Sequence, residues 1–119
     1  MESWSEKFLK IHIKKIINPN KMKIAIASTD DNVKGDISEK GGRAPYYLIF
    51  DEKHVLIESI KNPFAVGGGG AGFAVAKMLK DKEVTRVIVG KAGGNMKGAL
   101  EDAGMELVEK EGGILEALA

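Results

Sequence analysis

The residues with the clearest chemical potential lie in one short loop. Residues 38–45 read Ser-Glu-Lys-Gly-Gly-Arg-Ala-Pro, and the apolar run 46–50 follows directly. A strand is therefore predicted to present this loop, which is a common way for a rigid scaffold to hold a binding segment. Lys40 and Arg43 can pair with an anion through charge-assisted hydrogen bonds. The alternative is that Arg43 caps or bridges groups within the fold.

A second segment, residues 67–72, is glycine-rich and precedes an expected helix. Glycines at this place let backbone N–H groups converge on an anion, with the helix dipole assisting. The segment lacks the lysine and the hydroxyl residue that a phosphate loop carries at fixed spacing. A flexible connection around the edge of the sheet explains it equally well.

A third segment, residues 90–98, follows an expected central strand and opens a helix. It lies at the carboxyl end of that strand, where open α/β sheets bind their ligands. Lys91 and Lys97 add positive charge, and Asn95 either joins the site or caps the helix. We expect any anionic ligand to bind where the three segments meet. The candidate binding residues are Lys40, Gly41, Gly42, Arg43, Gly68, Gly69, Gly70, Gly93, Gly94 and Asn95.

The sequence argues against enzyme chemistry. A nuclease on such a sheet needs carboxylates within its strands to hold two divalent metals, and the runs 24–27, 48–50 and 87–89 contain none. With no cysteine, the chain has no thiolate nucleophile and no cysteine metal site. His54 falls at an expected hairpin turn, and a solvated loop accounts for Asp30-Asp31. We therefore expect no catalytic residue and no metal-ligating set.

A mixed α/β sheet is needed to position these loops. Apolar runs and glycine stops predict a strand, a hairpin, and then helix, strand, helix, strand and helix. The apolar runs 24–27 and 87–89 are typical of central strands buried on both faces. We expect the hairpin at one edge of the sheet and helices on both faces. The expected strands are 22–28, 45–51, 54–60, 86–90 and 106–109, and the expected helices are 72–82, 95–103 and 113–118.

The composition fits a single soluble domain. The chain has 119 residues, of which 44% are hydrophobic and 29% charged. No apolar run approaches the roughly 20 residues that a membrane-spanning helix needs, and the first residues lack the pattern of a secretory signal. We therefore expect a cytoplasmic protein without a membrane partner. The absence of cysteine and glutamine, with abundant Lys and Glu, also indicates a thermophilic source.

Residues 1–21 are predicted to be an accessory segment. Asn18-Pro19-Asn20 is a turn signal, and the compact domain is predicted to span residues 22–119. Residues 1–23 hold six lysines against two glutamates, so the overall charge of +1 leaves −3 for the rest of the chain. A nucleic-acid binder needs a basic face on its folded domain, so we expect no nucleic-acid partner. The basic segment is either a solvated leader or a contact for an acidic partner.

Several segments together carry a family resemblance. They are 22–28, 37–51 with the pattern Ile-Ser-Glu-x-x-Gly-Arg-Ala-Pro, 62–63, 87–94 and 103–104. In this order and spacing they resemble the family of nitrogenase iron–molybdenum cofactor biosynthesis domains, over most of residues 22–119. The resemblance implies a ribonuclease-H-like three-layer α/β fold with a mixed five-stranded sheet. It also implies a protein that binds or carries an anionic iron–molybdenum–sulfur type cluster without catalysis.

The chain departs from the family pattern inside this motif. Many members have His-Phe-Gly where this chain has Lys40-Gly41-Gly42, and the resemblance implies that the histidine is a proposed cofactor ligand. A protonated lysine has no lone pair to offer a metal, so Lys40 can pair only with the charge of a cluster. Two hypotheses follow. The chain is either a metallocluster-binding accessory protein, or an interaction or regulatory module that kept the fold, lost the ligand and binds a protein partner.

Overall fold

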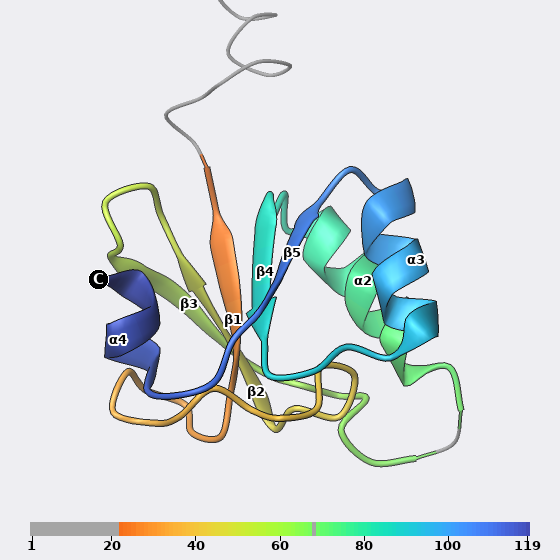
Figure 1. Ribbon diagram of the computed structural model, residues 1–119, viewed down its shortest axis with the longest axis horizontal. Coiled ribbons are helices and arrows are strands. Elements are labelled where there is room, and N and C mark those ends of the chain that lie inside the picture. Colours follow the sequence, from red (N-terminus) through yellow and green to blue (C-terminus); the bar gives the residue numbers. More distant parts are fainter. Residues whose placement is uncertain (1–21, 68) are drawn as a thin grey trace, which may run out of the picture.

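The computed structural model describes residues 22–67 and 69–119. The predicted accessory segment 1–21 and the candidate binding residue Gly68 lie outside the described residues. The described part forms one five-stranded sheet with three helices (Figure 1). The strands are β1 (Ile24–Ser28), β2 (Tyr46–Phe50), β3 (Leu56–Lys61), β4 (Arg86–Val89) and β5 (Glu106–Glu109). The helices are α2 (Ala71–Asp81), α3 (Gly94–Asp102) and α4 (Ile114–Leu118).

The sheet has the strand order β3-β2-β1-β4-β5. Its central strand, β1, pairs antiparallel with β2 and parallel with β4, and β5 extends the parallel half. All five residues of β1 are buried, as expected for a short apolar strand covered on both faces. β2 and β3 form an antiparallel hairpin that places β3 at the edge. The predicted mixed sheet with an edge hairpin is therefore confirmed.

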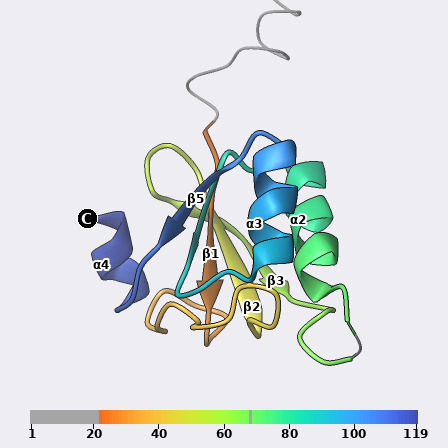
Figure 2. The same cartoon turned by 45° about the vertical axis from the view of Figure 1, so that its right-hand side comes forward.

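The helices cover the two faces of the sheet unequally. α2 and α3 lie side by side on one face, and the short α4 lies on the other (Figure 2). Val75 and Leu79 of α2 are buried in the first core, whereas Phe73 is 54% exposed. Ile114 of α4 is buried in the second core. None of the described helices is long and apolar enough to cross a membrane.

The first strand begins later than predicted. Met22 is exposed, and pairing with β2 and β4 begins only at Ile24. The carbonyl of Lys23 still accepts hydrogen bonds from the N–H groups of Thr85 and Arg86, at 2.9 and 3.3 Å. These bonds fix the residue before β1 against the start of β4. The expectation that Met22 opens a buried strand is therefore wrong by two residues, because burial requires neighbours on both sides.

The parallel pairing of β1 and β4 decides where a site can form. Both strands end at the same edge of the sheet, so the loop after β1 and the turn after β4 lie close together (Figure 1). α2 also begins at this edge, because it runs antiparallel to β4, the strand that follows it. α3 begins there too, because it directly follows β4 in the chain.

Candidate anion-binding cleft

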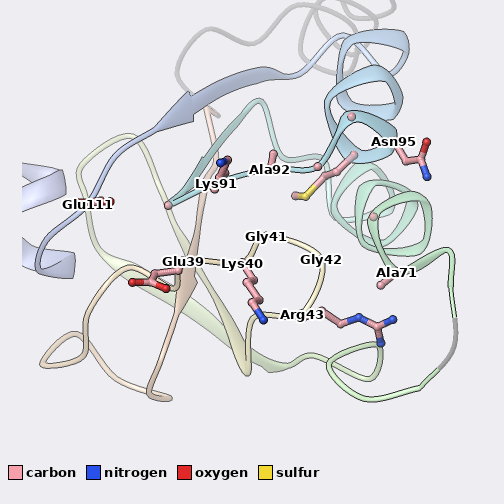
Figure 3. A pocket seen from close by; sticks show the side chains of 15 residues that line it. Glu39, Lys40, Gly41, Gly42, Arg43, Ala71, Lys91, Ala92, Asn95 and Glu111 are labelled. Carbon is pink, nitrogen blue, oxygen red and sulfur yellow. The ribbon is translucent and has the colours of Figure 1, made fainter.

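A cleft of about 840 Å³ opens at this edge of the sheet. Its walls come from the loop before β2, from the turn after β4, and from the first turns of α2 and α3 (Figure 3). The lining residues are 39–43, 71–72, 90–96 and Glu111. Two of the three glycine-bearing segments singled out in the sequence therefore line one cavity over most of their length.

The loop before β2 is tied to the turn after β4 by backbone hydrogen bonds. The N–H of Gly90 donates to the carbonyl of Ser38 at 2.8 Å, and the N–H of Gly41 donates to the carbonyl of Lys91 at 3.0 Å. A Cβ on Gly90 would lie 2.7 Å from the Cα of Glu39, so only glycine permits this approach. This backbone pairing brings Lys40 and Lys91 opposite each other in the wall of the cleft.

Two helices begin at the cleft. The N-cap positions are Gly70 for α2 and Gly93 for α3, and neither has a side-chain cap. Neither first turn carries an acidic residue. The two helix ends are adjacent, because a Cβ on Gly72 would lie 3.1 Å from the backbone nitrogen of Met96. Two positive helix ends with free first-turn N–H groups favour an anion between them.

The charged side chains of the cleft are mixed, with a positive excess. The lining holds three cationic side chains, Lys40, Arg43 and Lys91, and two carboxylates, Glu39 and Glu111 (Figure 3). Arg43 also donates to the carbonyl of Phe64 at 3.4 Å. Arg43 thus bridges to another part of the fold, which is the alternative that the sequence left open, and it also lines the cleft.

Glu109 is a polar anchor that the sequence did not reveal. From the end of β5 its carboxylate accepts the N–H of Ala92 at 3.0 Å and pairs with Lys97 at 3.1 Å. The Ala92 hydrogen bond and then the Lys97 interaction lower the pKa of Glu109 below its usual value. Lys97, which was predicted to add positive charge to the site, is paired with Glu109 and lies outside the lining. No local pattern marks Glu109, because its register opposite Val89 arises only in the folded sheet.

The predicted binding residues divide into three groups. Lys40, Gly41, Gly42, Arg43, Gly93, Gly94 and Asn95 line the cleft. Gly69 and Gly70 do not, and the chain reaches the cleft only with Ala71 and Gly72. Gly68 lies outside the described residues. Asn95 lies inside α3, whose N-cap is Gly93, so it does not cap this helix.

The chemistry of the lining suits charge recognition more than metal ligation. The lining residues include no histidine, and the chain has no cysteine. Over residues 22–67 and 69–119, no group of three or more His, Cys, Asp or Glu side chains could hold a metal ion. His54 is exposed in the turn between β2 and β3, at the opposite end of β2 from the cleft.

The fold and the cleft together define a class: a three-layer, ribonuclease-H-like α/β protein with a cationic cleft at the carboxyl ends of its central strands. The chain belongs to the dinitrogenase iron-molybdenum cofactor family, whose sequence profile matches residues 21–119. A comparison with curated proteins gave no significant match.

Three solved structures share the fold. The apo form of the orange protein from Desulfovibrio gigas has a TM-score of 0.76 at 22% identity, covering 82% of this chain and 84% of that one. The crystal structure of PH0822 has a TM-score of 0.69 at 22% identity, with 82% and 86% covered. A Thermotoga protein described as a NifB candidate of the DUF35 family has a TM-score of 0.70 at 28% identity, with 82% and 84% covered. The expected ribonuclease-H-like fold is therefore confirmed.

Proposed function

We propose that this protein binds or carries an anionic metallocluster of the iron–molybdenum–sulfur type in the cleft, without catalysing a reaction on it. The observation that carries the proposal is the convergence of two uncapped helix N-termini with Lys40, Arg43 and Lys91 on one cavity. Family membership supplies the class of anion. The cavity of about 840 Å³ is large enough for a cluster of several metal and sulfur atoms.

The lining residues fit a cluster that is held by its charge. Backbone N–H groups and cationic side chains can surround an anion and donate hydrogen bonds to its sulfur or oxygen atoms. Lys40 stands where many family members have a histidine, and it supplies a charge and no metal ligand at neutral pH. Binding is therefore expected to be electrostatic, and no protein side chain needs to bond directly to the metal.

An anaerobic titration with tetrathiomolybdate and with an extracted molybdenum–iron–sulfur cluster tests the proposal, followed by optical and EPR spectra. Affinity should fall markedly between low and high salt, because exposed charge pairs are screened over ~8–10 Å near physiological ionic strength. Arg43→Ala should weaken binding by about 1.5–3 kcal/mol, the range for a charge-assisted hydrogen bond. Lys40→His should strengthen cluster binding by adding a ligand.

A matched control separates the site from overall charge. Lys53→Ala also removes one positive charge, but Lys53 is exposed in the turn between β2 and β3, away from the cleft. It should leave the affinity nearly unchanged. If the wild type binds neither probe at low salt and Lys40→His gains no affinity, the cluster-carrier proposal fails.

The second candidate function is an interaction or regulatory module that kept the fold and lost the ligand. The replacement of the family histidine by Lys40 favours it. In this case the cleft recognises an acidic segment of a protein partner, and the titration above gives no spectral change at any salt concentration.

We also propose that residues 22–119 form the complete binding unit. A chain starting at Met22 should melt within a few degrees of the full chain and bind tetrathiomolybdate equally well. A loss of many degrees would show that residues 1–21 contribute to the core.

A further inference from the structure

Asn62 is a buried polar residue directly after β3. It forms hydrogen bonds to the loop before β2, residues 38–45, which is called the cleft loop from here on. It is 4% exposed and does not line the cleft. Its side-chain amide donates to the carbonyl of Gly42 at 3.1 Å and to that of Ala44 at 2.9 Å. Its amide oxygen accepts the N–H of Phe64 at 3.0 Å. Both N–H bonds and the oxygen of this side chain are thus used, and both donors go to the cleft loop.

Tyr47 supplies a second anchor on the same side. It is fully buried, and its hydroxyl donates to the carbonyl of Gly41. Burial raises the pKa of the Tyr47 hydroxyl above its usual range, so the group stays a donor. The carbonyls of Gly41, Gly42 and Ala44 are therefore all bonded to buried groups that lie outside the cleft lining.

The direction of these carbonyls affects what the cleft can bind. A carbonyl oxygen that faced the cavity would repel an anion, and here the carbonyls of Gly41, Gly42 and Ala44 are bonded to buried side chains instead. The N–H groups of Lys40 and Gly42 form no hydrogen bond within the described part of the chain, so they stay available to a ligand. A loop whose carbonyls point into the protein core and whose N–H groups are free is the backbone arrangement that binds anions.

Asn62 also influences the position of Arg43. Its oxygen fixes the N–H of Phe64, and the carbonyl of Phe64 accepts a hydrogen bond from the Arg43 guanidinium at 3.4 Å. The buried side-chain amide of Asn62 thus links the backbone of the cleft loop to the turn at Phe64, whose carbonyl is bonded to Arg43.

Asn32 shows that such a turn does not need these additional bonds. Its side-chain oxygen accepts the N–H of Lys34 at 2.9 Å, and its carbonyl accepts that of Gly35 at 3.3 Å. Asn62 makes the same two local bonds, to Phe64 and to Ala65. The amide of Asn32, however, is exposed and donates only to the neighbouring Asp31. The two donations to Gly42 and Ala44 are therefore extra to turn formation.

We propose that Asn62 is a positioning residue of the cleft, which turns the carbonyls of Gly42 and Ala44 inward and thereby presents N–H groups and Arg43 to the anion. The proposal rests on the proposed function only in taking the ligand to be an anion. The arrangement of the loop itself can be tested without any ligand.

The test uses a matched pair of substitutions, Asn62→Asp and Asn32→Asp. Each keeps the oxygen that closes the local turn and adds one negative charge, but only Asn62→Asp removes two donors from the loop. A charge-neutral variant, Asn62→Ala, accompanies them. Circular dichroism melts first identify the temperatures at which each variant is folded.

The first measurement is amide hydrogen exchange in the unliganded full-length protein. Exchange of the Gly41 N–H, which donates to the carbonyl of Lys91, should accelerate at least tenfold in Asn62→Asp and Asn62→Ala, with the core strand β1 unchanged. Asn32→Asp should leave the exchange of Gly41 as in the wild type. Acceleration spread evenly over the sheet would indicate general destabilisation and would overturn the proposal. So would unchanged exchange of Gly41 in both Asn62 variants.

The second measurement is tetrathiomolybdate affinity as a function of salt. Asn62→Ala should bind about tenfold more weakly, corresponding to the loss of one to two ordinary hydrogen bonds, with the same salt dependence as the wild type because no charge is lost. Arg43→Ala should instead reduce the salt dependence. Local acceleration of exchange together with a wild type that fails to bind would refute the proposed ligand and still support the positioning role.

Discussion

Two glycines of the cleft, Gly41 and Gly90, and the described glycines of the tract between β3 and α2 occupy contrasting surroundings. A Cβ on Gly41 would lie 2.6 Å from the sulfur of Met96, and one on Gly90 would lie 2.7 Å from backbone. A Cβ on Gly69 or Gly70 would meet nothing within 4 Å. Gly41 and Gly90 are thus required by close packing, whereas Gly69 and Gly70 stand in open space, as do Gly93 and Gly94 in the cleft lining.

This contrast shows that a high density of glycine in a sequence does not mark a binding segment. The tract is the most conspicuous glycine run in the chain, yet its described members Gly67, Gly69 and Gly70 lie outside the cleft lining. The missing Cβ of a glycine matters for packing only where another part of the protein or a ligand lies against its backbone. In the tract, Gly67 and Gly70 have φ angles of 133° and 87°. Residues with a side chain rarely adopt such positive φ angles, so glycine is needed there for the backbone conformation.

The largest expected effect comes from Gly90→Ala. The new Cβ would meet the Cα of Glu39 at 2.7 Å and the carbonyl oxygen of Ser38 at 2.8 Å, and neither backbone atom can rotate away. Overpacking of this kind should lower the free energy of unfolding by about 3 kcal/mol, measured by urea denaturation. Gly93→Ala is the control, because a Cβ there meets nothing within 4 Å and φ is −71°. Equal stability of the two variants would contradict the packing argument.

Gly41→Ala should have a smaller effect. Its nearest clash is with the sulfur of Met96, the flexible part of a side chain that can move. We expect a loss of about 1 kcal/mol in unfolding free energy. In a Met96→Ala background the same substitution should cost less, because the clashing sulfur is gone. A double-mutant cycle measures this difference, and additive costs would show that Met96 is not the obstacle.

The hydrogen bond from Ala92 in the turn after β4 to the Glu109 carboxylate should make the free energy of unfolding depend on pH. The pKa of Glu109 is lowered in the folded state, so its stabilising contribution is complete above the unfolded value of about 4.3 and is lost as pH falls through the lowered folded value. Glu109→Gln should flatten this part of the acid unfolding profile. Lys97→Met should flatten it only in part, since the Ala92 N–H remains as the first cause of the shift. An NMR titration of Glu109 reads the shift directly.

The smallest effect is expected for Gly69→Ala. Its Cβ meets no atom within 4 Å and its φ lies outside the left-handed region, so the substitution should stabilise the fold by ~0.5 kcal/mol through the unfolded state. Gly70→Ala should instead destabilise it, because φ is 87° there. Tetrathiomolybdate affinity of Gly69→Ala should equal that of the wild type. A weaker affinity would show that the tract takes part in binding, as its sequence predicts.

Much of the architecture follows from local pattern. Apolar runs place the five strands, and the spacing of Val75 and Leu79 gives the buried face of α2. Helix ends fall within one or two residues of the prediction, since glycines such as Gly104, with φ of 78°, mark them. Met22 was misplaced because a methionine before a strand resembles a strand residue, and only missing neighbours leave it exposed.

The candidate site was predictable in part. Lys40, Arg43 and the segment 93–95 line one cleft because the parallel register of β1 and β4 brings both loops to one edge. Lys97 was expected to add positive charge to the site, but it pairs with Glu109, and only the packing of α3 against β5 brings these two side chains together.

The sequence by itself determined the order of the elements and the positive charge of the loop before β2. These are local properties, set by side-chain type and by period along the chain. Only the tertiary structure decided which glycines are packed, and that Asn62 donates to carbonyls 20 and 18 residues away. The physical reason is that a hydrogen bond or a clash depends on distances between atoms, and strand register and helix packing set those distances.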